Sequence, residues 1–170
     1  MLETENNTIL EKSNEKTEMV SVPFKSNFSV WDRSDYSDTT CGEYPIFTLT
    51  MEGNGNIAHM GTITTVFTFC VDTSTGAYWG TEATFVAANG DKLYAIIPTG
   101  QIVPNEELNA TYYQTKFNDE MTFIGGTGRF EGAEGTAWTH AYVHDPSSLE
   151  DEWRTDFFSS GTLKLKKGNK

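Results

Sequence analysis

Apolar and polar residues alternate with a period of two along most of the chain. In residues 20–31, Val22 and Phe24 alternate with polar neighbours, and Phe28 and Val30 continue the same parity. This alternation is typical of a β-strand with one buried face. The same pattern predicts further strands at residues 46–52, 57–71, 77–87, 92–100, 110–117, 120–124, 129–143 and 153–166. No part of this body has the spacing of an amphipathic helix.

Turn-forming residues separate these segments. Gly-Asn-Gly-Asn at 53–56 predicts a tight hairpin turn, and residues 73–76 and 89–91 predict two more. The glycine-rich stretch 125–128 is predicted to end another strand in a turn. About eight strands joined by short turns predict an all-β protein, a single antiparallel eight-stranded β-barrel, with a two-sheet β-sandwich as the alternative. The interior of such a barrel is either filled by side chains or holds one small ligand.

The two ends of the chain differ from the body. Residues 1–20 are polar and lack aromatic residues, so we expect a disordered or tether segment there. Residues 21–166 are expected to form the barrel domain and residues 167–170 a short basic tail. Two locations fit this organisation: extracytoplasmic (secreted or lipid-anchored) if a signal sequence has been removed, and cytoplasmic if Met1 is the native start.

Charge and hydropathy exclude two kinds of partner. The 170 residues include 12 Lys and Arg against 24 Asp and Glu, which gives a net charge of −12. Because affinity for nucleic acid comes largely from Lys and Arg contacts with phosphate, we expect no nucleic-acid partner. No apolar run approaches the roughly 18 residues that a membrane-spanning helix needs, so no transmembrane span is predicted.

One segment resembles a known superfamily. Residues 121–135 read M-T-F-I-G-G-T-G-R-F-E-G-A-E-G, which resembles the GGTGRF-x-x-A-x-G segment of the allene oxide cyclase and dirigent barrels. The similarity is greatest to bacterial members of unknown function, many of them secreted or lipid-anchored. Residues 22–25, 55–61 and 89–94 are similar to the first strand of these barrels, to their G…H-[LM]-G segment and to their NGD hairpin.

The resemblance implies an eight-stranded barrel that binds a hydrophobic substrate and directs cyclisation or radical coupling without a redox cofactor. It therefore implies no cofactor. It also implies a homo-oligomer, either a dimer or a trimer. The candidate subunit contacts are Val30, Trp31 and the stripe of Trp138, His140 and Tyr142. The similarity lies in turns rather than in a catalytic set, which favours a barrel that binds a small hydrophobic molecule. A cofactor-independent cyclase or isomerase is the alternative, so the sequence leaves enzymatic activity open.

Three candidates for proton transfer lie on predicted strands next to aromatic residues. His59 shares the parity of Phe67 and is expected inside the barrel, either as an acid or base with a pKa near neutrality or as a core histidine bonded to a backbone carbonyl. His140 and Tyr142 share one face with Trp138. If that face points inward it forms an aromatic wall, and if it points outward it forms a surface stripe or a subunit contact.

Glu82 is the fourth candidate for proton transfer. In a regular strand it shares a face with Tyr78, while Trp79 and Phe85 lie on the opposite face. Because Trp79 and Phe85 look more buried, Glu82 is expected to face solvent. If Glu82 were buried instead, its raised pKa would suit a general acid or base.

The predicted ligand contacts are aromatic, because such rings supply large apolar surfaces: Phe67, Phe69, Tyr78 and Trp138. No metal site is predicted. Asp32, Asp35 and Asp38 recur every third residue, which is not the spacing of a calcium loop. Cys41 and Cys70 are the only two cysteines, and the sequence is compatible either with one disulfide in an oxidising compartment or with two free thiols in the cytosol.

Overall fold

The computed structural model describes residues 17–107, 109–146 and 152–168. Over these ranges the chain forms a short 3-10 helix, η1 (Gly128–Phe130), and nine strands: β1 (Met19–Asp32), β2 (Ile46–Ile57), β3 (Gly61–Asp72), β4 (Ala77–Ala87), β5 (Lys92–Gln101), β6 (Val103–Pro104), β7 (Thr115–Gly126), β8 (Glu134–His144) and β9 (Arg154–Lys166). The described part of the chain has no helix with the length and apolar character needed to span a bilayer.

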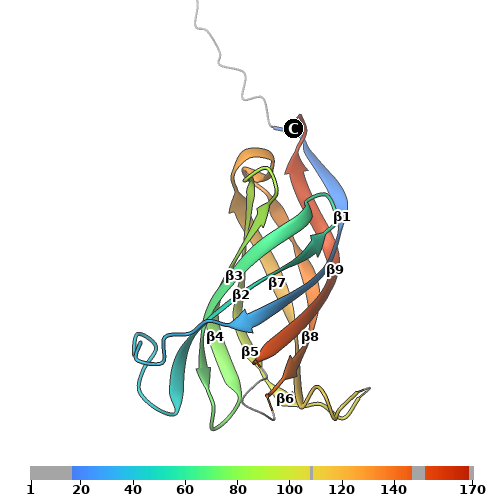
Figure 1. Ribbon diagram of the computed structural model, residues 1–170. Coiled ribbons are helices and arrows are strands. Elements are labelled where there is room, and N and C mark those ends of the chain that lie inside the picture. The colour runs from blue at the N-terminus through green and yellow to red at the C-terminus, as the bar shows by residue number, and fades with distance from the viewer. Residues whose placement is uncertain (1–16, 108, 147–151, 169–170) are drawn as a thin grey trace, which may run out of the picture.

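The sheet closes on itself into a barrel of eight antiparallel strands (Figure 1). The strand order is β5-β4-β3-β2-β1-β9-β8-β7, and pairing of β5 with β7 joins the two edges. The short strand β6 adds to β7. The predicted all-β barrel is therefore confirmed. Closure pairs strands that would otherwise be open to association with another chain.

Residues 53–56 are part of β2, so the hairpin turn predicted from their glycines is wrong. Gly53 lies opposite Val30 of β1, and a Cβ on Gly53 would lie 1.8 Å from the carbonyl oxygen of Ser29. Glycine here permits close approach of two strands rather than a reversal of the chain. The chain reverses a few residues later, at residues 58–60.

The stretch from β7 to β8 also differs from the prediction. Strand β7 is continuous where the sequence predicts separate strands at 110–117 and 120–124. The strand predicted at 129–143 begins only at Glu134, because η1 occupies the residues before it. The chain does turn between β7 and β8, as the glycine-rich stretch 125–128 predicts.

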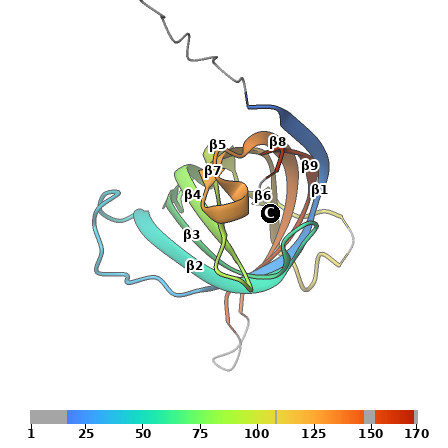
Figure 2. The same ribbon diagram turned by 90° about the horizontal axis from the view of Figure 1, so that it is seen from above.

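The interior of the barrel is packed toward one end. Helix η1 (orange) lies across this end in Figure 2 and places Phe130, 1 % exposed, in the core. We call this end the closed half. Its large, fully buried side chains include Phe24, Phe85, Phe130, Ile63, Leu93, Met121 and Leu163.

The opposite end, at the bottom of Figure 1, is hollow and is called the open half. Where the two halves meet, four phenylalanine rings form an aromatic layer, in which Phe28 and Phe85 belong to the closed half and Phe67 and Phe157 line the open half. Phe157 stacks on Phe28 and on Phe67, with centroid separations of 4.8 and 5.2 Å. Phe85 meets Phe67 edge-on at 5.8 Å. Stacked and edge-on rings attract one another in addition to the free energy gained from burying their surface. This layer therefore closes the inner end of the open half.

Candidate functional site

The open half contains a cavity of about 300 Å³. Its walls are mostly aliphatic and aromatic, and include Leu49, Met51, Phe69, Val71, Ile97 and Phe157. Exposed residues, among them Tyr36 and Thr73, line it as well, so the cavity reaches the surface. A concave, mainly apolar cavity with a few polar groups is typical of a small-molecule site.

The mouth of the cavity carries a polar pair from β1 and from the β1–β2 loop (residues 33–45). The Tyr36 hydroxyl donates a hydrogen bond to the Asp32 carboxylate, and the Tyr36 ring packs edge-on against Phe47 at 5.8 Å. Burial and the bond to Asp32 raise the pKa of Tyr36 to about 12. Tyr36 is protonated and donates at neutral pH, and the raised pKa extends this state further into the alkaline range. The β1–β2 loop thus forms part of the mouth.

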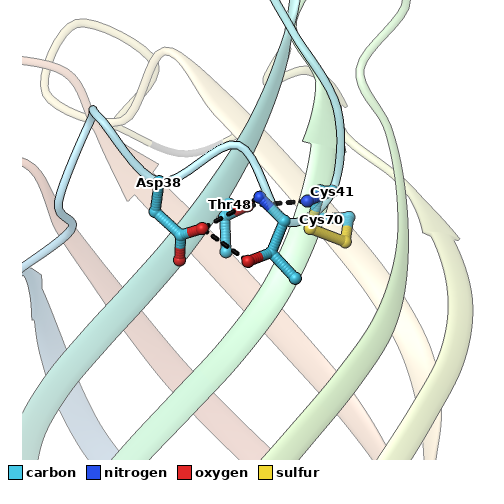
Figure 3. The surroundings of a disulfide bond; sticks show 5 residues. Asp38, Cys41, Thr48 and Cys70 are labelled. Carbon is cyan, nitrogen blue, oxygen red and sulfur yellow. Dashed lines mark hydrogen bonds between the residues drawn. A yellow bond between two sulfur atoms is a disulfide. The ribbon is translucent and has the colours of Figure 1, made fainter.

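A disulfide fixes the β1–β2 loop to the barrel (Figure 3). It joins Cys41 to Cys70 of β3, 29 residues apart, with a Cα–Cα distance of 5.6 Å. The hydroxyl oxygen of Thr48 accepts a hydrogen bond from the Cys41 N–H at 3.0 Å. Asp38 accepts bonds from the Thr40 hydroxyl and N–H, which lower the pKa of Asp38. Of the two alternatives that the sequence leaves open, the structure has the disulfide.

A β-bulge in β4 turns two hydroxyl-bearing side chains into the cavity. At Gly80, whose φ is 64°, β4 has one residue more than the β3 segment it pairs with. The bulge places Tyr78 and Thr81 on the same inner face, although residues three apart in a regular strand face opposite sides. Regular parity, which predicts Trp79 on the buried face, is therefore wrong at this point: Trp79 is only half-buried.

Three of the four predicted ligand contacts line the cavity. Phe67 and Phe69 reach it from β3, and Tyr78 reaches it from β4. Trp138 does not line it. Ala137 takes the inner position on β8, so Trp138 faces outward and is 48 % exposed.

The four predicted proton-transfer residues are not brought together. His59 is exposed in the turn between β2 and β3, so the prediction that it lies inside the barrel is wrong. The parity argument fails there because β3 begins only at Gly61. Glu82 is exposed on the outer face of β4, as expected, and His140 and Tyr142 lie on the outer face of β8. None of these four side chains is among the described residues that line the cavity.

The contacts of His140 and Tyr142 are with residues on the outside of the barrel. The Tyr142 hydroxyl donates to the Glu107 carboxylate at 3.0 Å, and this bond raises the pKa of Tyr142. His140 Nδ1 lies 2.9 Å from Asn118 Oδ1. The alternative of an outward-facing surface stripe is therefore the one that the structure shows.

Two buried carboxylates escaped the sequence reasoning, and the first is Asp156. It accepts hydrogen bonds from Ser29 of β1, from Tyr113 in the segment before β7 and from Arg154. Burial alone would raise the pKa of Asp156, but these hydrogen bonds outweigh burial and lower it. Asp156 thus fastens the segment before β7 to the outside of the barrel.

The second buried carboxylate, Asp119, faces the interior at the boundary between the two halves. On β7 it lies between Phe117, which lines the cavity, and Met121, which belongs to the closed half. Its Oδ2 has no hydrogen-bond partner in the described ranges, and burial raises the pKa of Asp119 to about 6. Opposite it, the hydroxyls of Thr139 and Ser159 bond to each other at 3.0 Å. The sequence predicts that one strand ends at residue 117 and the next begins at residue 120, so it does not place Asp119 on a strand or on its inward face.

No protein-family model matches the chain, and no match was found among curated proteins. The eight-stranded barrel is compatible with the allene oxide cyclase and dirigent resemblance, and membership of that superfamily stays a prediction. The cavity is therefore the feature of the molecule from which a function can be inferred.

Proposed function

We propose that this protein binds a small hydrophobic molecule in the open half of its barrel. The observation that carries the proposal is the apolar cavity of about 300 Å³, which reaches the surface at one end. Each Å² of apolar surface that a ligand removes from water contributes roughly 25 cal/mol. One water takes up about 30 Å³ in the liquid, so the cavity encloses a group on the order of ten non-hydrogen atoms, and the rest of a larger ligand can extend through the open mouth.

The cyclase alternative requires proton-handling groups at the bound substrate. The sequence predicts His59, Glu82, His140 and Tyr142 for that role, and their side chains lie outside the cavity. A binding role makes no such demand. The carboxylate that does line the cavity, Asp32, is hydrogen-bonded to Tyr36 at its mouth. We therefore favour binding over the cyclase alternative.

The test is titration with a neutral probe, N-phenylnaphthylamine, whose fluorescence rises in apolar surroundings. We expect saturable binding by the unmodified protein. Val71 lines the cavity from β3, so Val71→Trp should fill it and weaken binding by about tenfold or more. Val66, on the same strand, points outward and is 41 % exposed, so Val66→Trp is the matched control and should bind normally. No saturable binding, or equal weakening by both variants, would refute the proposal.

We also propose that the protein works outside the cytoplasm. The disulfide between Cys41 and Cys70 supports this location, because structural disulfides form and persist in oxidising compartments. The check is mass spectrometry of protein taken from its native cells and alkylated without reduction. Alkylation of both thiols would contradict an oxidising location, and no alkylation would support it.

Assembly into a homo-oligomer stays a prediction. Val30 is 1 % exposed and faces the barrel interior, so it is not available for the subunit contact predicted for it. Trp138 is exposed on the outer face, and Phe158 of the neighbouring strand is 45 % exposed. Light scattering decides the question: the chain mass of 18.9 kDa at high protein concentration would contradict an oligomer.

A further inference from the structure

Two residues that line the cavity have hydroxyl groups without a hydrogen-bond partner among the described residues. These hydroxyls are Tyr78 Oη and Thr81 Oγ1, on side chains of residues that are 4 % and 5 % exposed. Both residues line the cavity, and the bulge at Gly80 is what turns both of them inward. Buried hydroxyls in folded proteins are nearly always hydrogen-bonded, so two unpaired hydroxyls on residues that line one cavity point to a partner that enters it.

Packing, rather than hydrogen bonding, holds Tyr78 in place. Its ring lies across Gly100 of β5, where an added Cβ would come within 2.1 Å of the Tyr78 Cζ and 2.2 Å of its Oη. Phe117 and Phe69 meet the ring edge-on at 5.3 and 6.0 Å. A ring confined on these sides presents its hydroxyl at a defined position, which lowers the entropy lost when a ligand binds.

The charges around the cavity argue against an anionic ligand. The described residues that line it include no Lys, Arg or His, and their one carboxylate is Asp32. The whole chain has a net charge of −12. A buried anion without a counter-ion is strongly disfavoured, whereas a neutral oxygen can accept hydrogen bonds from two hydroxyls.

We infer that the ligand is a neutral, mainly apolar molecule with a hydrogen-bond acceptor, such as a ketone, ester or ether oxygen. Tyr78 Oη and Thr81 Oγ1 donate to that oxygen while the apolar remainder fills the cavity. This inference rests on the proposed binding function and adds the chemical class of the ligand. Among molecules of equal size it predicts a preference for neutral, oxygen-bearing ligands over carboxylates.

The experiment compares three naphthalene derivatives of similar size, with an isopropyl, an acetyl or a carboxylate substituent. Their dissociation constants are measured for the unmodified protein and for the double variant Tyr78→Phe/Thr81→Val, which removes both hydroxyls and keeps the shape. We expect the double variant to bind the isopropyl compound normally. Its preference for acetyl over isopropyl should fall by about tenfold, and the carboxylate should bind the unmodified protein most weakly.

A second double variant, Tyr94→Phe/Thr84→Val, is the matched control. Tyr94 and Thr84 face each other across β5 and β4 on the outer face, so their removal should leave all three dissociation constants unchanged. If the unmodified protein binds no probe, the proposed function itself fails, and this inference fails with it. If the probes bind but the preference for acetyl is the same in the Tyr78→Phe/Thr81→Val variant, or if the carboxylate binds tightest, only the ligand class is refuted.

Discussion

The closed and open halves of the barrel are built by the same strands, yet only the closed half is filled. Its inward positions carry large side chains such as Phe24 and Phe123, whose rings lie 4.7 Å apart. In the open half the inward positions include smaller side chains, among them Val71, Thr81 and Val143. The interior of an eight-stranded barrel is either filled by side chains or holds one small ligand, and the two halves of this barrel correspond to these two arrangements.

The two ends of the barrel also differ in how they are covered. At the closed end, Phe130 of η1 enters the core. At the open end, the β1–β2 loop lies beside the barrel wall, and the disulfide from Cys41 to Cys70 ties it to β3. Packing therefore holds one end, whereas a covalent link helps to hold the other. We expect stability to depend most on the closed half and ligand binding on the open half.

The largest expected effect comes from removing one aromatic ring in each half. Phe85 is fully buried in the closed half, so Phe85→Ala should lower the free energy of unfolding by about 3–5 kcal/mol. Phe69 is half-buried with one side toward the cavity, so Phe69→Ala should cost less than half as much. Urea denaturation measures both values. Equal losses would mean that the two halves contribute alike.

Removal of the disulfide tests how much this covalent link stabilises the open end. Closing a loop across 29 residues stabilises a protein by about 2–4 kcal/mol, mainly through the unfolded state. The double variant Cys41→Ser/Cys70→Ser should lose that stability. Hydrogen exchange should rise in the β1–β2 loop and stay slow in the closed half. Faster exchange around Phe130 would show that the disulfide supports the whole barrel.

The third prediction concerns how stability depends on pH through Asp119, which lies at the boundary between the halves. Its pKa is raised from 3.8 to about 6 in the folded protein, so folding disfavours its charged form. The charge therefore lowers stability progressively from about pH 4 to about pH 6, and above that pH the loss stays constant, at up to about 3 kcal/mol. Asp119→Asn should be more stable than the unmodified protein near pH 7 by up to this amount, and equally stable near pH 4. Thermal unfolding at the two pH values measures the stability difference between the variant and the unmodified protein. A difference that is the same at both pH values would contradict a raised pKa for Asp119.

Much of the fold could be predicted from the sequence, because a strand with one buried face has alternating apolar and polar residues. The inward positions of β1, such as Phe24 and Phe28, and the interior contact of Phe67 follow from that alternation. Glycine was harder to interpret. Glycine permits both turns and close strand approach, so the sequence of residues 53–56 wrongly predicts a turn, and a strand that begins directly after that turn would place His59 in the interior.

The candidate site was only partly predictable, for two physical reasons. A bulge shifts parity by one residue, so Thr81 could not be placed beside Tyr78 in the cavity before the pairing of β3 with β4 was known. The volume of the cavity depends on which inward side chains from different strands lie at the same level, and a single sequence does not contain that information. The sequence does not decide whether Cys41 and Cys70 pair, because pairing of cysteines depends on spatial proximity.

The smallest expected effect comes from adding volume to each half. Ile63 and Ile97 are both buried and face inward, but only Ile97 lines the cavity. In the packed surroundings of Ile63 a larger ring must displace its neighbours, so Ile63→Phe should cost about 1–3 kcal/mol of unfolding free energy. At Ile97 the ring can enter the cavity, so Ile97→Phe should cost less than about 1 kcal/mol and should weaken probe binding, which Ile63→Phe should leave unchanged. Stability and probe affinity measured on the same two variants give opposite orders if the halves are specialised, whereas equal destabilisation would show that the open half collapses around its cavity and has no room for a ligand.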